Sequence, residues 1–474
     1  MSVAGAAGRA GFGQARLAAS ALTRGRGWRL DGRVAHVGAL LMATLWVAGA
    51  RAQEDGGVAS TEPPPTNPTP PDAGYTDATD LFLAIGWAKP GRPQPEPFKL
   101  YPAILPAVGY SPSVGALLGV VGQFGMYLGD PDTTTISSLQ ATVLFTSKSQ
   151  VLFQVFSSVQ TEDDRWQFVG DWRLLLYNQD TYGLGTGIPP VKYGVTIGGQ
   201  GTTAALPGEQ PMDFKLIRLR EIALRRVWRE LSVGGGFGFD RYYDIVDKLL
   251  DLQASPPVVT SHYGYEKAYG LPTGAYSASG PVLAVSWDSR DSTINPYHGV
   301  YALLSSQWNA SWAGSTHESG LLNAEFRAYL PLSRAVPRNV LAFWVLASGV
   351  IGDMPYLTLP SVGWDGRNRS GRGYLQGRHR GTAMAYGEVE WRFRLTNNGI
   401  LGGVVFANVE SFARPTFVAS GVTLAGESLF QSARWGGGFG LRILMNRVSR
   451  TNITLDFAWG AGLFGIYFGA GEVF

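Results

Sequence analysis

Residues 367–395 read Arg367-Asn-Arg-Ser-Gly-Arg-Gly-Tyr-Leu-Gln-Gly-Arg-His-Arg-Gly381 and then Thr382-Ala-Met-Ala-Tyr-Gly-Glu-Val-Glu-Trp-Arg-Phe-Arg-Leu395. The second part alternates with a period of two, which predicts a β-strand that is apolar on one face and ionised on the other. The apolar face carries Val389, Trp391, Phe393 and Leu395, and the ionised face carries Glu388, Glu390, Arg392 and Arg394. The first part is a loop with five arginines, which need acidic partners or water.

The composition of the 474 residues narrows the fold class. The chain is 45% hydrophobic but only 16% charged, whereas soluble domains are usually about 25% charged. The body has no run of roughly 18 to 20 apolar residues for a membrane-spanning helix. With 63 glycines and 12% aromatic residues, many short strands are predicted instead.

Several kinds of site and partner are excluded or disfavoured by the same data. The chain has no cysteine, so disulfides and cysteine-based metal sites are excluded. The net charge is only +3, and the basic residues do not form a block interleaved with aromatic residues, so we expect no nucleic-acid partner. The five histidines show no ligand spacing, and the glycine-rich residues 183–187 and 234–238 do not open a helix. We therefore expect no enzyme activity, no cofactor and no metal.

The N-terminal region has the pattern of an export signal. Four arginines between positions 24 and 33 precede an apolar run at 37–48, and Ala50-Arg-Ala52 fits the small-x-small cleavage pattern. A signal peptide is predicted at residues 1–52; a short buried helix is the alternative. Residues 53–98 are rich in proline and predict a disordered, solvated periplasmic linker. The ordered body is predicted at residues 99–474.

Sixteen segments of this body alternate with a period of two and are separated by turn residues. They are residues 101–110, 114–128, 136–146, 150–160, 165–177, 214–228, 231–244, 277–287, 300–312, 321–332, 339–350, 383–395, 400–412, 435–445, 451–459 and 463–474. Neither face of 214–228 is cleanly apolar, so a bulge or a misplaced boundary is expected there. An even number of strands in this range is typical of an outer-membrane β-barrel, in which the apolar faces meet lipid.

The lengths of the connections support this interpretation. If the N-terminus lies in the periplasm, the even-numbered connections must be the short ones, because such barrels have short periplasmic turns and longer outer loops. The longest connections, at 178–213, 245–276, 351–382 and 413–434, are all odd-numbered. The predicted fold is therefore an all-β, antiparallel, membrane-spanning barrel of about 16 strands, located in the outer membrane of a Gram-negative bacterium.

The C-terminus also has a pattern of its own. Phe464, Ile466 and Phe468 alternate toward the terminal Phe474, and a strand that reaches the last residue must pair with the first strand to close its edge. This ending is similar to the C-terminal signal by which outer-membrane proteins are recognised for assembly. Pro102 and Pro106 in the first strand predict an imperfect seam, because proline has no donor for the ladder.

In this topology, Arg372, Gly373 and Tyr374 occupy the sixth outer loop, followed by Gly377-Arg378 and by Glu390-x-Arg392 on the next strand. These residues resemble the BamA/TamA-type outer-membrane assembly family, also called the bacterial surface antigen family, which carries an Arg-Gly-Phe/Tyr loop tip at this place. The resemblance implies that the loop folds back into the lumen and that its arginine contacts acidic residues of the inner wall. The expected latch residues are Arg372, Gly373, Tyr374 and Arg378, and the expected wall partners are Glu388, Glu390, Arg392, Asn408 and Glu410.

Further motifs extend the resemblance over residues 100–474. Asp288-Ser-Arg-Asp291 resembles the family's periplasmic turn between strands eight and nine; the matching turn residues are Asp288, Arg290, Asp291, Pro296 and Gly299. Residues 436–442 and 455–458 resemble its last strands. Two features depart from the family. Phe406-Ala-Asn-Val-Glu410 has Asn408 in place of an aspartate, so we hypothesise that Glu390, helped by Glu410, neutralises Arg372. The linker is also too short and too poor in core residues for a POTRA domain, so a barrel without POTRA domains is expected.

The resemblance implies insertion or translocation of proteins at the outer membrane. The alternative is a pore or structural barrel without assembly activity, and an adhesin is a third interpretation that rests on the long loops. The expected partners are outer-membrane lipid, the cell's own barrel-assembly machinery and client proteins of unknown identity. A monomer is expected. His379, between Arg378 and Arg380, is interpreted as a residue of a solvated loop, because no nucleophile is adjacent to it.

Overall fold

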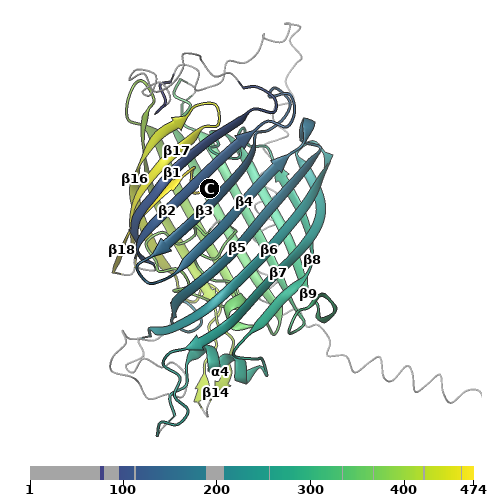
Figure 1. Cartoon of the computed structure of the whole chain (residues 1–474), viewed down its shortest axis with the longest axis vertical. Coiled ribbons are helices and arrows are strands. Elements are labelled where there is room, and N and C mark those ends of the chain that lie inside the picture. Colours follow the sequence, from purple (N-terminus) through teal and green to yellow (C-terminus); the bar gives the residue numbers. More distant parts are fainter. Residues whose placement is uncertain are drawn as a thin grey trace, which may run out of the picture.

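The computed structural model describes residues 75–78, 95–111, 114–187, 208–255, 257–333, 335–366, 368–419, 422–460 and 462–474. The predicted signal peptide and most of the predicted linker lie outside these residues. The described part forms a barrel whose wall is a single sheet of 16 antiparallel strands (Figure 1), as predicted. No helix in this part is long and apolar enough to cross a membrane.

The strands follow the chain order around the wall. They are β1 (Leu100–Ser111), β2 (Gly115–Met126), β3 (Ser137–Thr146), β4 (Val151–Gln160), β5 (Trp166–Thr181), β6 (Gln210–Trp228), β7 (Leu231–Asp247), β8 (Tyr276–Asp288), β9 (Gly299–Asn309), β10 (Ser319–Pro331), β11 (Val340–Gly352), β12 (Ala383–Arg394), β13 (Leu401–Ala413), β16 (Arg434–Asn446), β17 (Thr451–Gly460) and β18 (Leu463–Ala470). A small separate hairpin consists of β14 (Phe417–Ala419) and β15 (Val422–Leu424). The one described α-helix is α4 (Ser261–Ala268).

β6 has an irregular register. The β6–β7 ladder shifts between Asp213 and Lys215 and again between Arg226 and Trp228. The inward face of β6 keeps one parity across the first shift, and it carries apolar residues such as Phe214 and Leu216 as well as Arg218, so neither face is cleanly apolar. The expected irregularity in this strand is therefore confirmed, and the strand begins four residues earlier than predicted.

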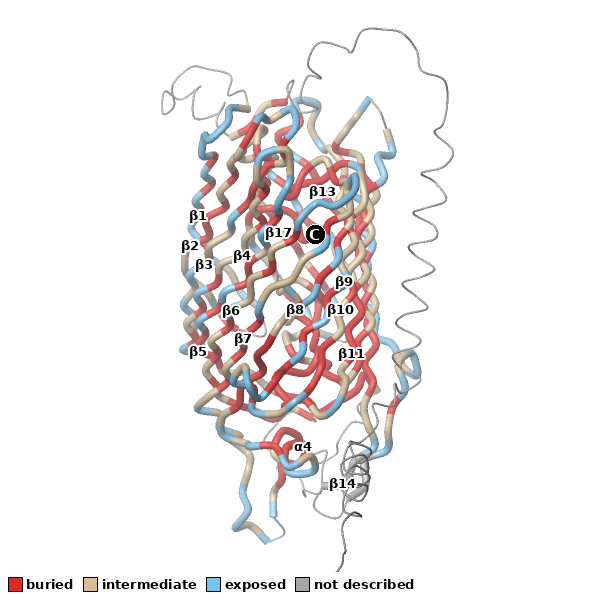
Figure 2. Tube along the Cα trace, turned by 90° about the vertical axis from the view of Figure 1, so that its right-hand side faces the viewer, coloured by how far each residue is buried: buried red, intermediate tan, exposed pale blue. Residues whose placement is uncertain are grey.

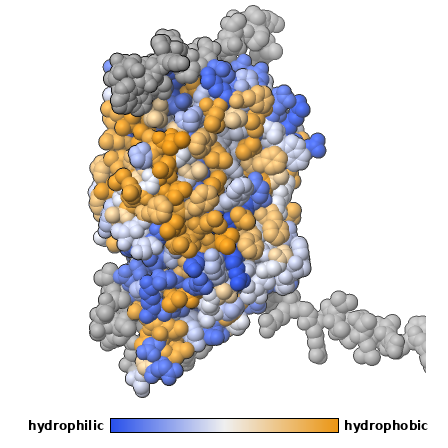
Figure 3. Space-filling model, in the orientation of Figure 1, coloured by the Kyte–Doolittle hydropathy of each residue, from blue (hydrophilic) through white to orange (hydrophobic). Residues whose placement is uncertain are grey.

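The two faces of the wall meet different surroundings. On β5, Trp172 and Leu174 are 46% and 49% exposed, whereas Arg173 between them is completely buried. Figure 2 shows this alternation of exposed and buried positions along the barrel wall. On the outer surface, apolar side chains form a broad band with hydrophilic residues beyond it (Figure 3). This is the surface that a barrel presents to lipid, with its ionised side chains in the lumen.

The two ends of the barrel differ. The strand ends that are joined by the long connections 182–209, 248–275, 353–382 and 414–433 lie at one end of the barrel, where α4 and β14 also lie; we call this the loop end (Figure 1). The shorter turns, such as 229–230, 395–400 and 447–450, lie at the other end, which we call the turn end. The predicted sorting of connections by length is therefore present in the fold.

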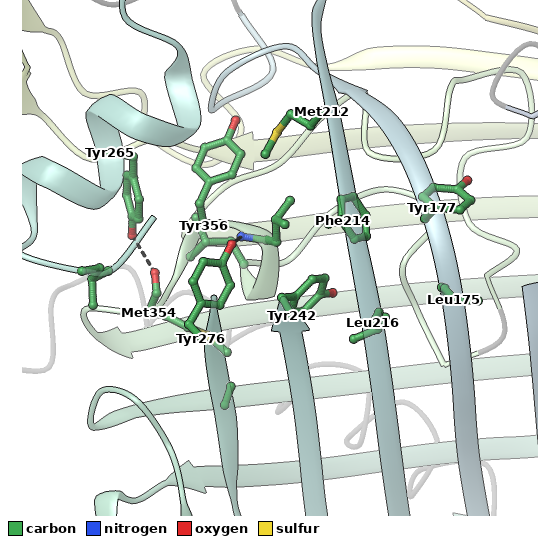
Figure 4. Close-up of a cluster of buried hydrophobic side chains, with 14 of the residues drawn as sticks. Leu175, Tyr177, Met212, Phe214, Leu216, Tyr242, Tyr265, Tyr276, Met354 and Tyr356 are labelled. Carbon is green, nitrogen blue, oxygen red and sulfur yellow. Dashed lines mark hydrogen bonds between the residues drawn. The ribbon is translucent and has the colours of Figure 1, made fainter. Parts of the chain in front are cut away.

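An aromatic cluster closes the lumen at the loop end. Tyr177, Phe214, Tyr242 and Tyr276 project inward from β5 to β8, and the residues that follow β11 pack against them (Figure 4). The Tyr265 hydroxyl of α4 donates to the carbonyl oxygen of Met354 at 3.1 Å. The chain after β11 is thereby directed into the barrel rather than away from it.

The seam between β1 and β18 is not joined like the other strand pairs. The two strands are neighbours, and Leu105 and Ala107 of β1 belong to one apolar cluster with Ala470 of β18. Among the described residues, however, no ladder of backbone hydrogen bonds joins them, and β1 and β18 are the two ends of the sheet. This agrees with the imperfect seam expected from the prolines of β1.

The prediction that the last strand runs to the C-terminal residue is wrong. β18 ends at Ala470, and Gly471 has a φ of +79°, a left-handed conformation that favours glycine. The chain turns into the lumen there, so Phe474 is buried instead of continuing the lipid-facing row. Its ring lies 5.2 Å from that of Trp344 on β11 and 6.2 Å from that of Tyr329 on β10.

A short piece of the predicted linker also differs from its expected solvated state. Tyr75 and Asp77 are buried against the turn end. The Thr76 amide donates to the carbonyl oxygen of Asn398, and Asp77 accepts from the Arg447 amide at 3.0 Å. The segment therefore docks on the β12–β13 and β16–β17 turns, because an aromatic ring and a carboxylate there supply contacts that proline-rich composition does not reveal.

Candidate functional site

The centre of the candidate site is Arg372, at the tip of the long loop between β11 and β12. Its guanidinium donates to Glu388 and Glu390 of β12 and, at 2.7 Å, to Asp456 of β17. Arg372 is only 3% exposed. One buried cation thus connects strands from two parts of the wall, through charge-assisted hydrogen bonds of the strong kind.

Burial and charge act in opposite directions on this arginine. Removal from water disfavours the charged form of Arg372, but the three surrounding carboxylates outweigh that effect and hold its pKa well above its usual value. The guanidinium is therefore always charged. It also lies over the ring of Phe406 on β13, 3.4 Å from the ring centre, which adds a cation–π contact.

The backbone of the loop tip fits closely against the wall. Gly373 has a φ of +99°, and a Cβ at this position would lie 2.6 Å from the backbone of Trp459. The Gly373 amide donates to the Tyr467 hydroxyl of β18 at 3.1 Å. Asn408 of β13 donates through its side chain to the carbonyl oxygen of Arg372 at 3.0 Å. Asn408 stands where the family resemblance implies an aspartate, and here its side-chain amide donates a hydrogen bond to the loop backbone.

The other expected latch residues contact partners other than the three carboxylates. Tyr374 donates to the carbonyl oxygen of Trp435 on β16 at 2.5 Å. Arg378 instead stacks over Tyr182, 4.0 Å from the ring centre, near the loop end. Of the two arginines in the motif, Arg372 therefore binds the wall carboxylates, whereas Arg378 contacts Tyr182 in the connection after β5.

The expectations for Glu410 of the wall and for His379 of the loop were wrong. Glu410 was expected to help neutralise Arg372, but it pairs with His379 Nδ1 at 2.6 Å. His379 was interpreted as a solvated loop residue, but it is 3% exposed. Both differences have one cause: the loop folds so deeply into the lumen that its second half contacts β13.

A second arginine cluster fixes the C-terminal tail beside the loop. Arg392 donates through Nε to Glu390 at 2.7 Å and through Nη2 to the carbonyl oxygen of Phe474 at 2.9 Å. Glu472 accepts from Arg442 at 2.8 Å and from Asn452 at 2.6 Å. The loop, the tail and three wall strands are therefore parts of one buried polar network.

The turn between β8 and β9 is also folded inward, at the turn end. Arg290 forms a two-bond pair with Asp288, at 2.8 and 2.7 Å, and lies over the ring of Tyr301. Asp291 accepts from Arg450 of the β16–β17 turn at 2.5 Å. Pro296 lies in this turn, and Gly299, with a φ of +103°, begins β9 where a Cβ would lie 2.2 Å from a carbonyl oxygen. The motif therefore links two turns of the barrel rather than forming an isolated hairpin.

The C-terminal residues divide into two groups. Phe464 and Phe468 are 40% and 36% exposed on the outward face of β18, and Ile466 shares that face. Phe474 lies in the lumen. Sequence reasoning also missed that Asp456, Arg442 and Glu472 belong to the site. The alternation of β16 and β17 places Asp456 and Arg442 on the lumenal face, but their contact with the loop depends on the closed barrel.

Among the residues that the structure describes, no cluster of histidine, aspartate and glutamate side chains is suited to hold a metal ion. What the site supplies is charge compensation: guanidinium and carboxylate groups that hold a loop and a chain terminus in the lumen.

Two solved structures and one family model are similar to this chain. The chain is similar to the solved structure of BamA from Haemophilus ducreyi lacking POTRA domains 1–3, with 14% sequence identity, a TM-score of 0.45, and coverage of 78% of this chain and 69% of that chain. It is also similar to CdiB from Acinetobacter baumannii, with 12% identity, a TM-score of 0.44, and coverage of 78% of this chain and 59% of that chain. No curated protein matches the sequence. The model of the Omp85 superfamily domain matches residues 260–474, the part of the chain that carries most of the motifs resembling the BamA/TamA-type family.

Proposed function

We propose that this protein is an outer-membrane barrel that inserts proteins into the membrane or translocates them across it, and that the β1–β18 seam is the place where it does so. The observation that carries the proposal is the combination of this seam with a filled lumen. The seam lacks a hydrogen-bonded ladder in the described residues, while the inward loop, the β8–β9 turn and the C-terminal tail occupy the interior.

An unladdered edge favours insertion because its free backbone groups can pair with another strand. Unpaired N–H and C=O groups at a sheet edge are a template for strand addition. In lipid such groups are costly when unsatisfied, so an incoming strand would gain from pairing there. A filled lumen argues against a wide aqueous pore, which is the alternative function.

In this proposal the Arg372 centre is a latch that stabilises the barrel while the seam opens. Arg372, Gly373 and Tyr374 tie the loop to β12, β13, β16 and β17 and, through Tyr467, to the seam strand β18. The buried turn around Asp288 and Asp291 braces the turn end. The outward Phe464, Ile466 and Phe468 form the signal that the cell's own assembly machinery recognises, and the protein works as a monomer in outer-membrane lipid.

A disulfide across the seam tests the proposal directly, because the chain has no natural cysteine. Cysteines are introduced at Leu105 or Ala107 of β1 together with Ala470 of β18, and the pair that crosslinks is used. The protein is reconstituted in liposomes, where assisted insertion of a client barrel and ion conductance are measured in parallel. The locked seam is expected to abolish assisted insertion, and reduction is expected to restore it.

The matched control places a disulfide between strands that already form a ladder. Ser232 of β7 and Ser286 of β8 are register partners, and both are buried. The crosslinked S232C/S286C variant is expected to insert clients normally. Undiminished insertion through a locked seam would refute the proposed site of action, and conductance without any assisted insertion would favour the pore.

A further inference from the structure

The lumen contains a polar cavity of about 250 Å³ beside the latch. Its walls come from β2 to β7 and from β9 to β12, and it is closed by loop residues 354–366, by Arg369 and by the start of the C-terminal tail. Much of the lining is neutral and polar, with serine, glutamine and asparagine side chains such as Ser158, Gln307 and Asn323. A cavity of this size has room for several waters or for a small solute.

Most arginines around the cavity have a carboxylate of their own. Arg218 donates through Nε and Nη2 to both oxygens of Asp240, each at 2.8 Å. Next to this pair, Arg173 donates to both oxygens of Asp171, at 2.6 and 2.7 Å. On the opposite wall, Arg327 pairs with Glu325, and Arg290 pairs with Asp288 as described above. These carboxylates are therefore already occupied.

Arg220 on β6 is different. It lines the cavity, its side chain is only 22% exposed, and it makes no hydrogen bond with any described residue. Its one salt bridge with a described residue is to Asp240 at 3.7 Å, a carboxylate that Arg218 already engages through both oxygens. The Nε of Arg220 is buried without a partner. Because arginine has five donors and cannot lose its charge, such a group requires acceptors from outside the protein.

A second guanidinium on the cavity is also without a carboxylate of its own. Arg369 of the loop donates to Gln140 at 2.9 Å and to the carbonyl oxygens of Ala470 and Glu472. The two acidic side chains nearby have other donors. Asp365 accepts from the backbone amides of Arg369 and Ser370 and from the Ser370 hydroxyl, and Glu472 accepts from Arg442.

We propose that this cavity binds a small oxyanion, a carboxylate or phosphate group, with Arg220 as its charged anchor. The guanidinium offers the paired donors that match two oxygens of such a group. Asn323 supplies a neutral donor on the opposite wall, because its Oδ1 accepts from Ser348 and its amide NH₂ group remains available. The proposal concerns a ligand of the lumen and does not depend on the seam.

Isothermal titration of the full chain in detergent micelles tests the proposal, with sodium phosphate and sodium acetate as the two probes at constant ionic strength. At least one probe is expected to bind saturably. The variant Arg220→Gln is expected to weaken binding on the order of 10- to 100-fold, the range for a lost hydrogen bond to a charged group. Arg220→Lys retains the positive charge but lacks the paired donors of the guanidinium, and this variant is expected to bind the probes with intermediate affinity.

The matched control removes a charge from the same strand on its other face. Arg225 is exposed and lies over Trp166, so Arg225→Gln is expected to bind the probes like the unmodified chain. Circular dichroism and heat-modified gel mobility show whether each variant is folded. Absence of saturable binding for both probes overturns the proposal, as does equal binding by Arg220→Gln or an equal loss in Arg225→Gln. Tighter binding by Asp240→Asn, which removes the nearest negative charge, supports it.

Discussion

Replacement of Arg372 by methionine is the most direct perturbation of the latch. Methionine retains most of the aliphatic volume but removes the cation that Glu388, Glu390 and Asp456 share. The three carboxylates are at most 5% exposed, and the two glutamates lie two residues apart on one face. Arg372→Met therefore leaves the buried Glu388 without a cation, whereas Glu390 retains Arg392 and Asp456 retains Arg442.

The expected cost follows from this burial. Breaking a buried ion pair by removal of one partner costs about 3–5 kcal/mol, because the remaining charge keeps its desolvation penalty. At about 1.4 kcal/mol per factor of ten, opening of the loop should become roughly two to four orders of magnitude more frequent. Part of this cost should be recovered in Arg372→Met/Glu388→Gln, since the uncompensated charge is then absent.

Two measurements check the prediction on protein refolded in detergent: the rate of proteinase K cleavage within residues 353–382, and the denaturant midpoint of barrel unfolding. Arg165→Met is the control, because the Arg165 side chain is 68% exposed and its surface pair with Asp163 should contribute at most about 1 kcal/mol. If Arg372→Met leaves both the cleavage rate and the midpoint at the values of the control, the latch is not what holds the loop.

Three further predictions concern the loop end, the loop tip and the tail. Burial raises the pKa of Glu266 to about 8, so the folded state holds an extra proton between the ordinary glutamate pKa and about pH 8. Stability at α4 is then present at low pH and lost as pH rises through 8; the protection factors of the α4 amides, which correct for the intrinsic pH dependence of exchange, should fall over this range, and Glu266→Gln should remove that fall. Gly373→Ala should expose the loop to protease, because its φ costs about 1–2 kcal/mol for an L-residue and the Cβ also meets the wall backbone; a cleavage rate unchanged from the parent chain would contradict this. Phe474→Ala should destabilise the refolded barrel by about 3–5 kcal/mol through loss of its packing on Trp344, and an unshifted denaturant midpoint would show that the tail contributes nothing.

The wall of the barrel was predictable from the sequence because alternation is a local property. Each strand carries its own period of two, so segment boundaries agree with the structure within a few residues over most of the chain. The place of the 353–382 loop at the loop end followed from the parity of the connections, without any knowledge of contacts. The pairing of Arg372 with Glu388 and Glu390 was expected from the family resemblance, and the two glutamates are near Arg372 in sequence.

Contacts across the lumen were decided only by the tertiary structure. Asp456 is far from Arg372 in sequence, and it reaches the loop only because the loop folds into the barrel against the consecutive strands β12, β13, β16 and β17. The inward turn at Gly471 depends on one left-handed residue and on an aromatic site on β10 and β11, neither of which alters the alternation that predicted a longer strand. Arg220 is a further example. The alternation of its strand places it in the lumen, but the pairing of β6 with β7 decides that Arg218, and not Arg220, forms the two hydrogen bonds with Asp240. Local periodicity therefore determines which face a side chain occupies, whereas barrel closure determines which charges meet there.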